Sequence, residues 1–279
     1  MIETFRNAWR VPELRKKLLF TFFIIIIYRV GGTVPVPYLD SVALSAWFEQ
    51  SASSGDFFSY LNVLSGGNFS KATLLALSVS PYINAQIIIQ LLTYALPPLE
   101  RLQKEGPEGR KKLNKITKYA SLAIAIFQAW AYYLTMKKAG ACVYTDGFSK
   151  IFAEIVIIAC FTAGASLTIW LGDEINEKGI GNGISMLLFA GIIARGPSAV
   201  IGLFDYMKTG EAKNIILVIA ILVVFILMIG FIIFMNEAER RIPIQYAKRV
   251  VGRKQYGGQN TFIPIKIAMS GVMPIIFAM

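Results

Sequence analysis

Six long apolar runs constrain this chain more than any other feature of its sequence. They cover residues 18–28, 72–99, 119–136, 151–171, 184–194 extended by 197–204, and 214–235. A helix needs roughly 20 apolar residues to cross the hydrocarbon core of a bilayer. The chain is 55% hydrophobic and only 16% charged, whereas soluble domains carry about 25% charged residues. We therefore expect an all-α polytopic membrane protein with six spans.

A seventh apolar run begins at Ile267 and continues to the last residue, Met279. A helix of this length reaches only about 20 Å, too short to cross a bilayer. We expect it to be the start of a seventh span, and the chain to be part of a longer protein. The first run is expected to be a permanent span, because Arg29, Pro35 and Pro37 follow it and no small-residue cleavage site is present.

The distribution of positive charge predicts the topology. The net charge is +11, and 20 of the 28 Lys and Arg residues fall on one side of the alternating spans. Basic loops stay in the cytoplasm, so the N-terminus is expected to be cytoplasmic. Residues 1–17 are expected to form a basic amphipathic helix at that membrane surface. An ordinary positive-inside anchor explains the same residues equally well.

The residue types needed for catalysis or ion coupling are missing. The chain contains no histidine, which excludes imidazole metal sites and His-based catalysis. No nucleotide-binding or hydrolase motif is present, and no carboxylate lies near the middle of a predicted span, where a coupled transporter would place one. Cys142 and Cys160 have no metal-ligand spacing and are not expected to pair. We expect no enzymatic activity, no metal and no cofactor.

Residues 66–92, GGNFSKATLLALSVSPYINAQIIIQLL, do not read as one ordinary span. The stretch opens on two glycines, and Pro81 removes a backbone hydrogen bond partway along it. We predict a re-entrant segment at about 66–77, followed by a longer helix from about residue 81. Irregular backbone at membrane depth is tolerated only where protein covers it or a water-filled cavity adjoins it. A proline-kinked ordinary span is the alternative.

The cytoplasmic loop 236–266 combines basic and apolar residues. Alternation in RRIPIQYAKRVV favours a strand or hairpin, which Gly257 and Gly258 are expected to turn back. Basic side chains on a structured protrusion suit an anionic partner such as RNA phosphates or an acidic protein surface. The alternative is that these charges only orient the chain and contact anionic lipids.

Several stretches resemble one family closely. SVSPYINAQIIIQLL, EGPEGRKKLNKITKY, WLGDEINEKGIGNGISMLLFAGIIA and RRIPIQYAKRVVGRKQYGGQNTFIPIKIAMSGVMPIIFA are similar to SecY, the channel subunit of the bacterial protein-translocation complex. VPELRKKLLFTF and RVGGTVPVP resemble the N-terminal helix and first span of that family. The similarity covers nearly the whole chain.

The resemblance implies a channel fold with two pseudo-symmetric halves. Residues 18–205 would form the first half, with spans 1 to 5. Residues 213–279 would begin the second half, with span 6, the loop 236–266 and the start of span 7. A plug helix would occupy residues 62–74, and a ring of aliphatic side chains would narrow the pore.

The resemblance also implies roles for individual residues. The pore ring would contain Val79, Ile83, Leu188 and Ile276. The plug would include Leu61, Asn62, Val63, Leu64, Ser65, Gly66, Gly67, Asn68, Phe69 and Ser70. The lateral gate would include Ile87, Gln90, Leu91 and Ser121, and of the polar residues Asn84, Gln86 and Gln90 some would face the pore or gate. The surface for the SecA ATPase or the ribosome would include Arg110, Lys111, Arg240, Arg241, Lys248, Arg249, Arg253 and Lys254.

The function implied by the resemblance is a passive conduit in the bacterial cytoplasmic membrane. It would pass unfolded secretory polypeptides across the membrane and release membrane segments sideways into the lipid. Its expected partners are SecE, SecG, SecA, the ribosome, signal peptides, nascent chains and anionic lipids. A small-molecule secondary transporter and a non-transporting docking subunit for ribosomes are the alternative functions.

Overall fold

The computed structural model describes residues 9–51, 57–144, 147–208, 212–244, 249–251, 254–256 and 261–266. The chain divides into two compact units, residues 1–199 and 200–279.

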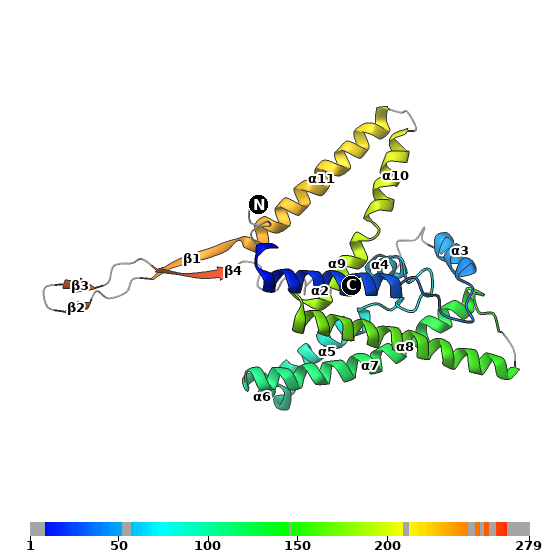
Figure 1. Ribbon diagram of the computed structural model, residues 1–279, viewed down its shortest axis with the longest axis horizontal. Coiled ribbons are helices and arrows are strands. Elements are labelled where there is room, and N and C mark those ends of the chain that lie inside the picture. Colours follow the sequence, from blue (N-terminus) through cyan, green and yellow to red (C-terminus); the bar gives the residue numbers. More distant parts are fainter. Residues whose placement is uncertain are drawn as a thin grey trace. The chain divides into compact units, whose positions relative to one another are not determined.

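The first unit is helical (Figure 1). Among its described residues the helices are α2 (Pro12–Gly31), α3 (Ser41–Ser51), α4 (Phe57–Leu64), α5 (Ser80–Ala95), α6 (Pro97–Lys104), α7 (Pro107–Lys138), α8 (Gly147–Lys178) and α9 (Gly183–Ile193). The next helix, α10 (Gly196–Lys208), begins in this unit and ends in the second. The long helices α7 and α8 lie side by side, and α5 packs against α7.

Proline and asparagine define several of the helix starts. Prolines occupy the first or second position of α2, α5, α6 and α7, where the missing N–H group has no helical partner in any case. Asn182 caps α9, because its side-chain oxygen accepts a hydrogen bond from the Ser185 amide at 3.2 Å. The break between α5 and α6 falls at Leu96, which is extended as the residue before a proline commonly is.

Two apolar clusters form the core of the first unit. One joins α3, α7 and α8 around buried side chains such as Leu44, Tyr132 and Phe161. The other joins α2, α8 and α9 around Ile24, Ile175 and Leu187. The non-helical residues 65–79, which we call the irregular segment, contribute side chains to both clusters.

Helices α8 and α9 approach closely at two glycines. A Cβ atom on Gly183 would lie 1.9 Å from the carbonyl oxygen of Gly172, and one on Gly172 would lie 2.7 Å from Ile184. Small residues of this kind let two helix backbones come together where the surroundings are apolar. This contact fixes where the GIGNGIS turn directs α9.

The second unit contains α11 (Ala212–Glu237) and two pairs of antiparallel strands. Strand β1 (Glu239–Ile244) pairs with β4 (Thr261–Lys266), with Glu239 opposite Lys266. Strand β2 (Arg249–Val251) pairs with β3 (Lys254–Tyr256). The strand prediction for this loop is confirmed. Gly257 and Gly258, where a turn is predicted, lie outside the described residues.

Among the described residues, three helical stretches are long and apolar enough to cross a membrane. They are Gly147–Lys178, Gly183–Lys208 and Lys213–Glu237. Helices α2, α5 and α7 cover the other three predicted spans. Helix α5 has 16 residues, about 24 Å at 1.5 Å per residue, and is shorter than the apolar run predicted for it. The reason is that residues 72–79 are not helical and Pro97 follows the break at Leu96.

Candidate functional site

The irregular segment is the part of the first unit that departs most from helical structure. Its backbone has positive φ at Gly66, Gly67, Ala72 and Ser78, with values of 69°, 90°, 47° and 48°. Positive φ is rare for residues with a Cβ atom. The surrounding structure must therefore hold Ala72 and Ser78 in place, and such over-determined backbone is common at functional sites.

Main-chain contacts tie this segment to the chain that leaves α2. The Leu74 amide donates to the Val34 carbonyl at 2.8 Å, and the Val36 amide donates to the Ala72 carbonyl at 3.2 Å. Pro35 and Thr73 form an antiparallel bridge between these hydrogen bonds. Buried backbone groups need such partners when no helix supplies them.

Side chains at the end of α4 accept hydrogen bonds from the turn that follows it. Ser65 Oγ accepts from the Phe69 amide at 3.0 Å, and Asn62 Oδ1 accepts from the Ser70 amide at 3.1 Å. The Asn62 carbonyl accepts from the Gly67 amide at 2.8 Å. These groups allow the chain to leave α4 without exposing unpaired donors.

Aromatic side chains hold the first half of the irregular segment. Phe69 stacks on Tyr132 with ring centroids 4.2 Å apart, and the Tyr132 hydroxyl donates to the Phe69 carbonyl. Phe48 and Phe161 complete the group at 5.4 Å from Phe69 and 5.1 Å from Tyr132. Aromatic pairs at these distances contribute roughly 0.5–1.5 kcal/mol each beyond their area burial.

The second half of the segment packs against α2. The hydroxyls of Tyr28 and Ser78 are 2.8 Å apart in a buried hydrogen bond. Leu75 and Val79 are buried in the same cluster as Tyr28. One segment therefore bridges both apolar clusters.

Gly66 makes the segment's closest approach to α9. A Cβ atom at Gly66 would lie 2.5 Å from the carbonyl oxygen of Gly191, which would force one backbone to move. The positive φ of Gly66 independently favours glycine. The contact with Gly191 and the positive φ therefore both favour glycine at position 66.

The predicted plug helix differs from the structure. The resemblance places it over residues 62–74, but the helix here is α4, which ends at Leu64. The rest of the predicted plug, Ser65 to Ser70 and onward, lies in the irregular segment. The positive φ values at Gly66 and Gly67 explain why the helix does not continue.

The predicted pore-ring residues occupy different environments. Val79 is only 1% exposed and belongs to the cluster around Tyr28, so it does not line open space. Ile83 and Leu188 are half-buried at the edge of that cluster. Ile276 lies outside the described residues. The structure brings Val79, Ile83 and Leu188 together at one cluster, with Val79 inside it.

The predicted gate residues also separate into exposed and buried groups. Gln90 and Leu91 are exposed on α5 and Ile87 is half-buried, whereas Pro81, Ala85, Ile89 and Thr93 form its buried stripe. Ser121 is fully buried, and its hydroxyl donates to the Lys118 carbonyl at 2.7 Å. Its placement at the gate stays a prediction, for a residue that is buried within the first unit. Of the other two polar residues expected near the pore or gate, Gln86 is exposed and Asn84 is half-buried.

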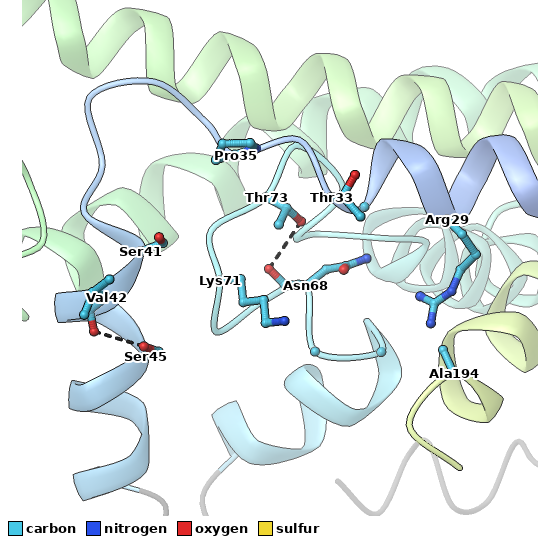
Figure 2. Close-up of a pocket in the computed structure, with 13 residues that line it drawn as sticks. Arg29, Thr33, Pro35, Ser41, Val42, Ser45, Asn68, Lys71, Thr73 and Ala194 are labelled. Atoms are coloured by element: carbon cyan, nitrogen blue, oxygen red, sulfur yellow. Dashed lines mark hydrogen bonds between the residues drawn. The ribbon is translucent and has the colours of Figure 1, made fainter. Parts of the chain in front are cut away.

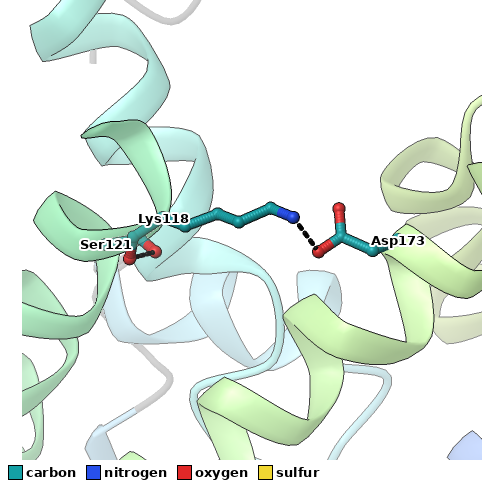
Figure 3. Close-up of polar contacts among 3 residues, drawn as sticks. All are labelled: Lys118, Ser121 and Asp173. Atoms are coloured by element: carbon teal, nitrogen blue, oxygen red, sulfur yellow. Dashed lines mark hydrogen bonds and ion pairs between the residues drawn. The ribbon is translucent and has the colours of Figure 1, made fainter. Parts of the chain in front are cut away.

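An ion pair joins α7 to α8 near Ser121 (Figure 3). Lys118 Nζ lies 2.7 Å from Asp173 Oδ2, and both side chains are partly exposed. Partly exposed pairs contribute at most about 1 kcal/mol. Lys118 and Asp173 therefore fix how two helices lie together more than they stabilise the fold.

The predicted basic surface is only partly described. Arg110 and Lys111 are exposed at the start of α7, and Arg240 and Arg241 are exposed on β1. Arg249 and Lys254 belong to strands β2 and β3. Lys248 and Arg253 lie outside the described residues. Arg241 sits over the ring of Phe262, 4.6 Å from its centroid.

Several residues that hold the irregular segment are not indicated by the sequence. They are Tyr28, Phe48, Tyr132, Phe161 and Gly191. A buried tyrosine hydroxyl needs a partner, but nothing in the sequence says which backbone it reaches. Within the described residues, no group of three His, Cys, Asp or Glu side chains could hold a metal.

Comparisons with known proteins place this geometry in context. A family model for SecY matches residues 73–279. Over its full length the chain is 40% identical to the protein translocase subunit SecY of Streptomyces coelicolor and 41% identical to that of Aquifex aeolicus. It spans 64% and 65% of the length of these relatives.

Solved structures with a similar fold were also found. A protein-conducting channel superposes with a TM-score of 0.62 at 20% identity, covering 95% of this chain and 55% of the other. A second, from a study of the SecY plug domain in the closed channel, gives 0.62 at 22% identity with the same coverage. Sec61 in a canine ribosome–channel complex gives 0.55 at 20% identity, covering 82% of this chain and 49% of the other.

Proposed function

The chain belongs to the SecY family, and from that premise we propose that it forms the first half and the start of the second half of a protein-conducting channel. The observation that carries the proposal is the irregular segment, buried between two apolar clusters of a membrane protein. It is held by hydrogen bonds to α2, α4, α7 and the chain around Val34, and by packing in both apolar clusters. Such a segment can close a pore when seated and leave it without breaking a helix.

In this proposal the plug is the end of α4 together with the irregular segment, rather than a helix over residues 62–74. Ile83 and Leu188 face the translocating chain, and Ile276 belongs to the same ring. Val79 lies behind them as part of the packed wall. A ring of aliphatic side chains yields around a moving polypeptide and dewets when idle, which blocks ions.

The conduit is passive and not an enzyme. No carboxylate lies near the middle of a predicted span, so the chain offers no ion-coupling site of the usual kind. Energy for movement would come from the SecA ATPase or the translating ribosome, which would dock on the basic residues Arg110, Lys111, Arg240 and Arg241 and their neighbours in the loop 236–266. SecE and SecG would complete the membrane complex.

The proposed location is the bacterial cytoplasmic membrane, with the N-terminus in the cytoplasm. Signal peptides and membrane segments would leave sideways past Ile87, Gln90 and Leu91 on the exposed face of α5. Anionic lipids would contact the basic cytoplasmic loops.

Reconstitution tests the proposal directly. The full-length protein with SecE, SecA and ATP in liposomes should move a preprotein into a protease-protected lumen. Uptake of a small solute down an ion gradient without preprotein movement would instead favour a secondary transporter. Ribosome binding with neither activity would favour a docking subunit.

Two variants separate the parts of the proposal. Ile83→Gly should raise resting ion conductance in planar bilayers, with the exposed Ile88→Gly as the matched control on the same helix. Reversing Arg249 and Arg253 to Glu should weaken SecA and ribosome binding and leave insertion intact. Unchanged binding in the second experiment would mean that these charges serve orientation only.

A further inference from the structure

A cavity of about 750 Å³ lies where the end of α2, the start of α3, the irregular segment and the end of α9 meet (Figure 2). Polar side chains from separate elements line it, including Arg29, Thr33, Ser41, Asn68 and Lys71. All of its lining residues belong to the first unit. The cavity is distinct from the apolar cluster that holds Val79, Ile83 and Leu188.

Cations outnumber acids around this cavity. Arg29 and Lys71 line it, none of the lining residues is acidic, and neither cation has an ion-pair partner among the residues that the structure describes. A third cation, Arg195, lies beside Gly67, with Nε 3.5 Å from the position of a Cβ there. The neighbouring Asp40 is engaged elsewhere, because its Oδ1 accepts from the Val42 and Ala43 amides at 2.9 and 3.2 Å.

Asn68 contributes a buried hydrogen-bond donor to the same cavity. Its side chain is 6% exposed and lines the cavity, and its amide nitrogen has no hydrogen-bond partner among the described residues. A buried amide donor without a partner costs roughly 1–3 kcal/mol. Figure 2 shows the Asn68 carboxamide extending toward the side of the cavity where Arg29 lies.

We propose that this cavity binds a phosphate-type oxyanion, held by Arg29, Lys71 and the Asn68 amide. A guanidinium matches the geometry of phosphate oxygens, and an ammonium adds a point charge. Inorganic phosphate and the headgroup phosphate of an anionic phospholipid share this chemistry. Arg29 lies near the end of α2, the level at which a lipid headgroup would meet a span.

Binding there would add a charged link between two elements that the Tyr28–Ser78 hydrogen bond already joins. Arg29 belongs to α2, whereas Asn68 and Lys71 belong to the irregular segment. An anion between them neutralises their mutual repulsion and links the segment to α2. This inference concerns a ligand and stands apart from the pore proposal.

A charge-selective thiol probe tests the site. Thr33→Cys places a thiol at the cavity, in a full-length protein in which Cys142, Cys160 and any further cysteine are replaced by Ser. An anionic methanethiosulfonate should label it about tenfold faster than a cationic one, the ratio expected when a local potential of about 1 kT acts on the two probes in opposite directions. Inorganic phosphate at ten times its Kd should slow the anionic labelling about tenfold, as occupancy of a single site requires.

Two lipid arms identify the source of the phosphate group. In phosphate-free buffer, nanodiscs of phosphatidylglycerol should protect the introduced thiol if a lipid headgroup occupies the cavity, whereas nanodiscs of phosphatidylcholine should not. Protection by inorganic phosphate alone would assign the site to the free anion. Absence of protection by both would overturn the proposal.

Charge variants test whether Arg29 and Lys71 hold the anion. The double variant Arg29→Gln, Lys71→Gln should lose both the labelling preference and the protection. Lys71→Gln alone, at an exposed position, should lose part of each and guards against misfolding of the double variant. Lys115→Gln, an exposed cation of α7 that does not line the cavity, is the matched control. Protection that survives in the double variant would also overturn the proposal.

Discussion

Two of the non-helical regions of this chain differ in where their backbone hydrogen bonds find partners. The irregular segment at residues 65–79 is mostly buried and takes its hydrogen bonds from α2, α4, α7 and the chain around Val34. Strands β1 and β4 pair with each other, and their described side chains are exposed. The backbone of the irregular segment therefore depends on neighbouring elements for its hydrogen bonds, whereas β1 and β4 bond to each other.

This difference predicts how far the structural effect of a substitution spreads in each region. In the irregular segment one side chain often satisfies a backbone group far away in the sequence, so a change there disturbs several elements. In the strand pairs the backbone hydrogen bonds run between the two strands of each pair, so a change should stay local.

The largest effect is expected from Gly66→Ala. The new methyl group would meet the Gly191 carbonyl at 2.5 Å and would sit on a residue with φ of 69°. Left-handed strain and overpacking together should lower stability by about 2–4 kcal/mol. Thermal unfolding of the purified protein in detergent measures the loss.

Gly140→Ala separates the backbone strain from the overpacking. Gly140 has nearly the same φ, 70°, but no atom lies within 4 Å of a Cβ there. It should cost only the strain, about 1–2 kcal/mol. Equal losses in the two variants would mean that the contact with Gly191 does not constrain the segment.

Tyr132→Phe should have the next largest effect. It removes the hydroxyl that donates to the Phe69 carbonyl but keeps the stacked ring. Because that carbonyl also accepts from the Ala72 amide at 3.3 Å, the loss should be about 1 kcal/mol. Hydrogen exchange at residues 69–74 should accelerate. Tyr133→Phe is the control, since the Tyr133 hydroxyl makes no hydrogen bond within the described residues; the same acceleration there would contradict the assignment.

Arg241→Gln tests the strand pair of β1 and β4. It removes the cation above the Phe262 ring, an exposed contact that contributes below about 1 kcal/mol. Amide exchange should rise only in β1 and β4 and stay unchanged in the first unit. Arg240→Gln, on the neighbouring residue, should change exchange less. Faster exchange in the first unit would show that the strands are not independent of it.

The smallest effect concerns Cys142, in the connection between α7 and α8. Burial raises the pKa of this thiol above its ordinary value of 9.0, Lys137 lowers it and Glu154 raises it again. Because only the thiolate reacts, alkylation in a Cys160→Ser protein should be slow near pH 8 and should rise until the pH passes this raised pKa. A rate that levels off below pH 9 would contradict the assignment. Glu154→Gln should bring the inflection down.

Much of the fold follows from sequence patterns. The apolar runs locate α8, α9 with α10, and α11, and Pro81 marks the start of α5 to within one residue. Alternation in RRIPIQYAKRVV locates β1 and β2. These features depend on local propensity and on hydrophobic periodicity, which a single sequence displays.

The errors arise where tertiary contacts override local preference. Ala72 and Ser78 adopt positive φ because the chain around Val34 and the Tyr28 hydroxyl hold that backbone, which no local pattern indicates. The resemblance assigns Val79 to the pore and Ser121 to the gate, and both assignments stay predictions. Packing against α2, α8 and α9 buries Val79, and the packed face of α7 buries Ser121, which no local sequence pattern indicates.

The irregular segment belongs to two apolar clusters at once, and this has a consequence for how it can move. Withdrawing Leu75 and Val79 from one cluster pulls on Phe69 and Ala72 in the other through a short, strained backbone. Intermediate positions therefore lose contacts on both sides and gain none. Departure of the segment should be all-or-none, so resting currents through a channel of this kind should come as discrete steps of uniform size and not as a graded leak.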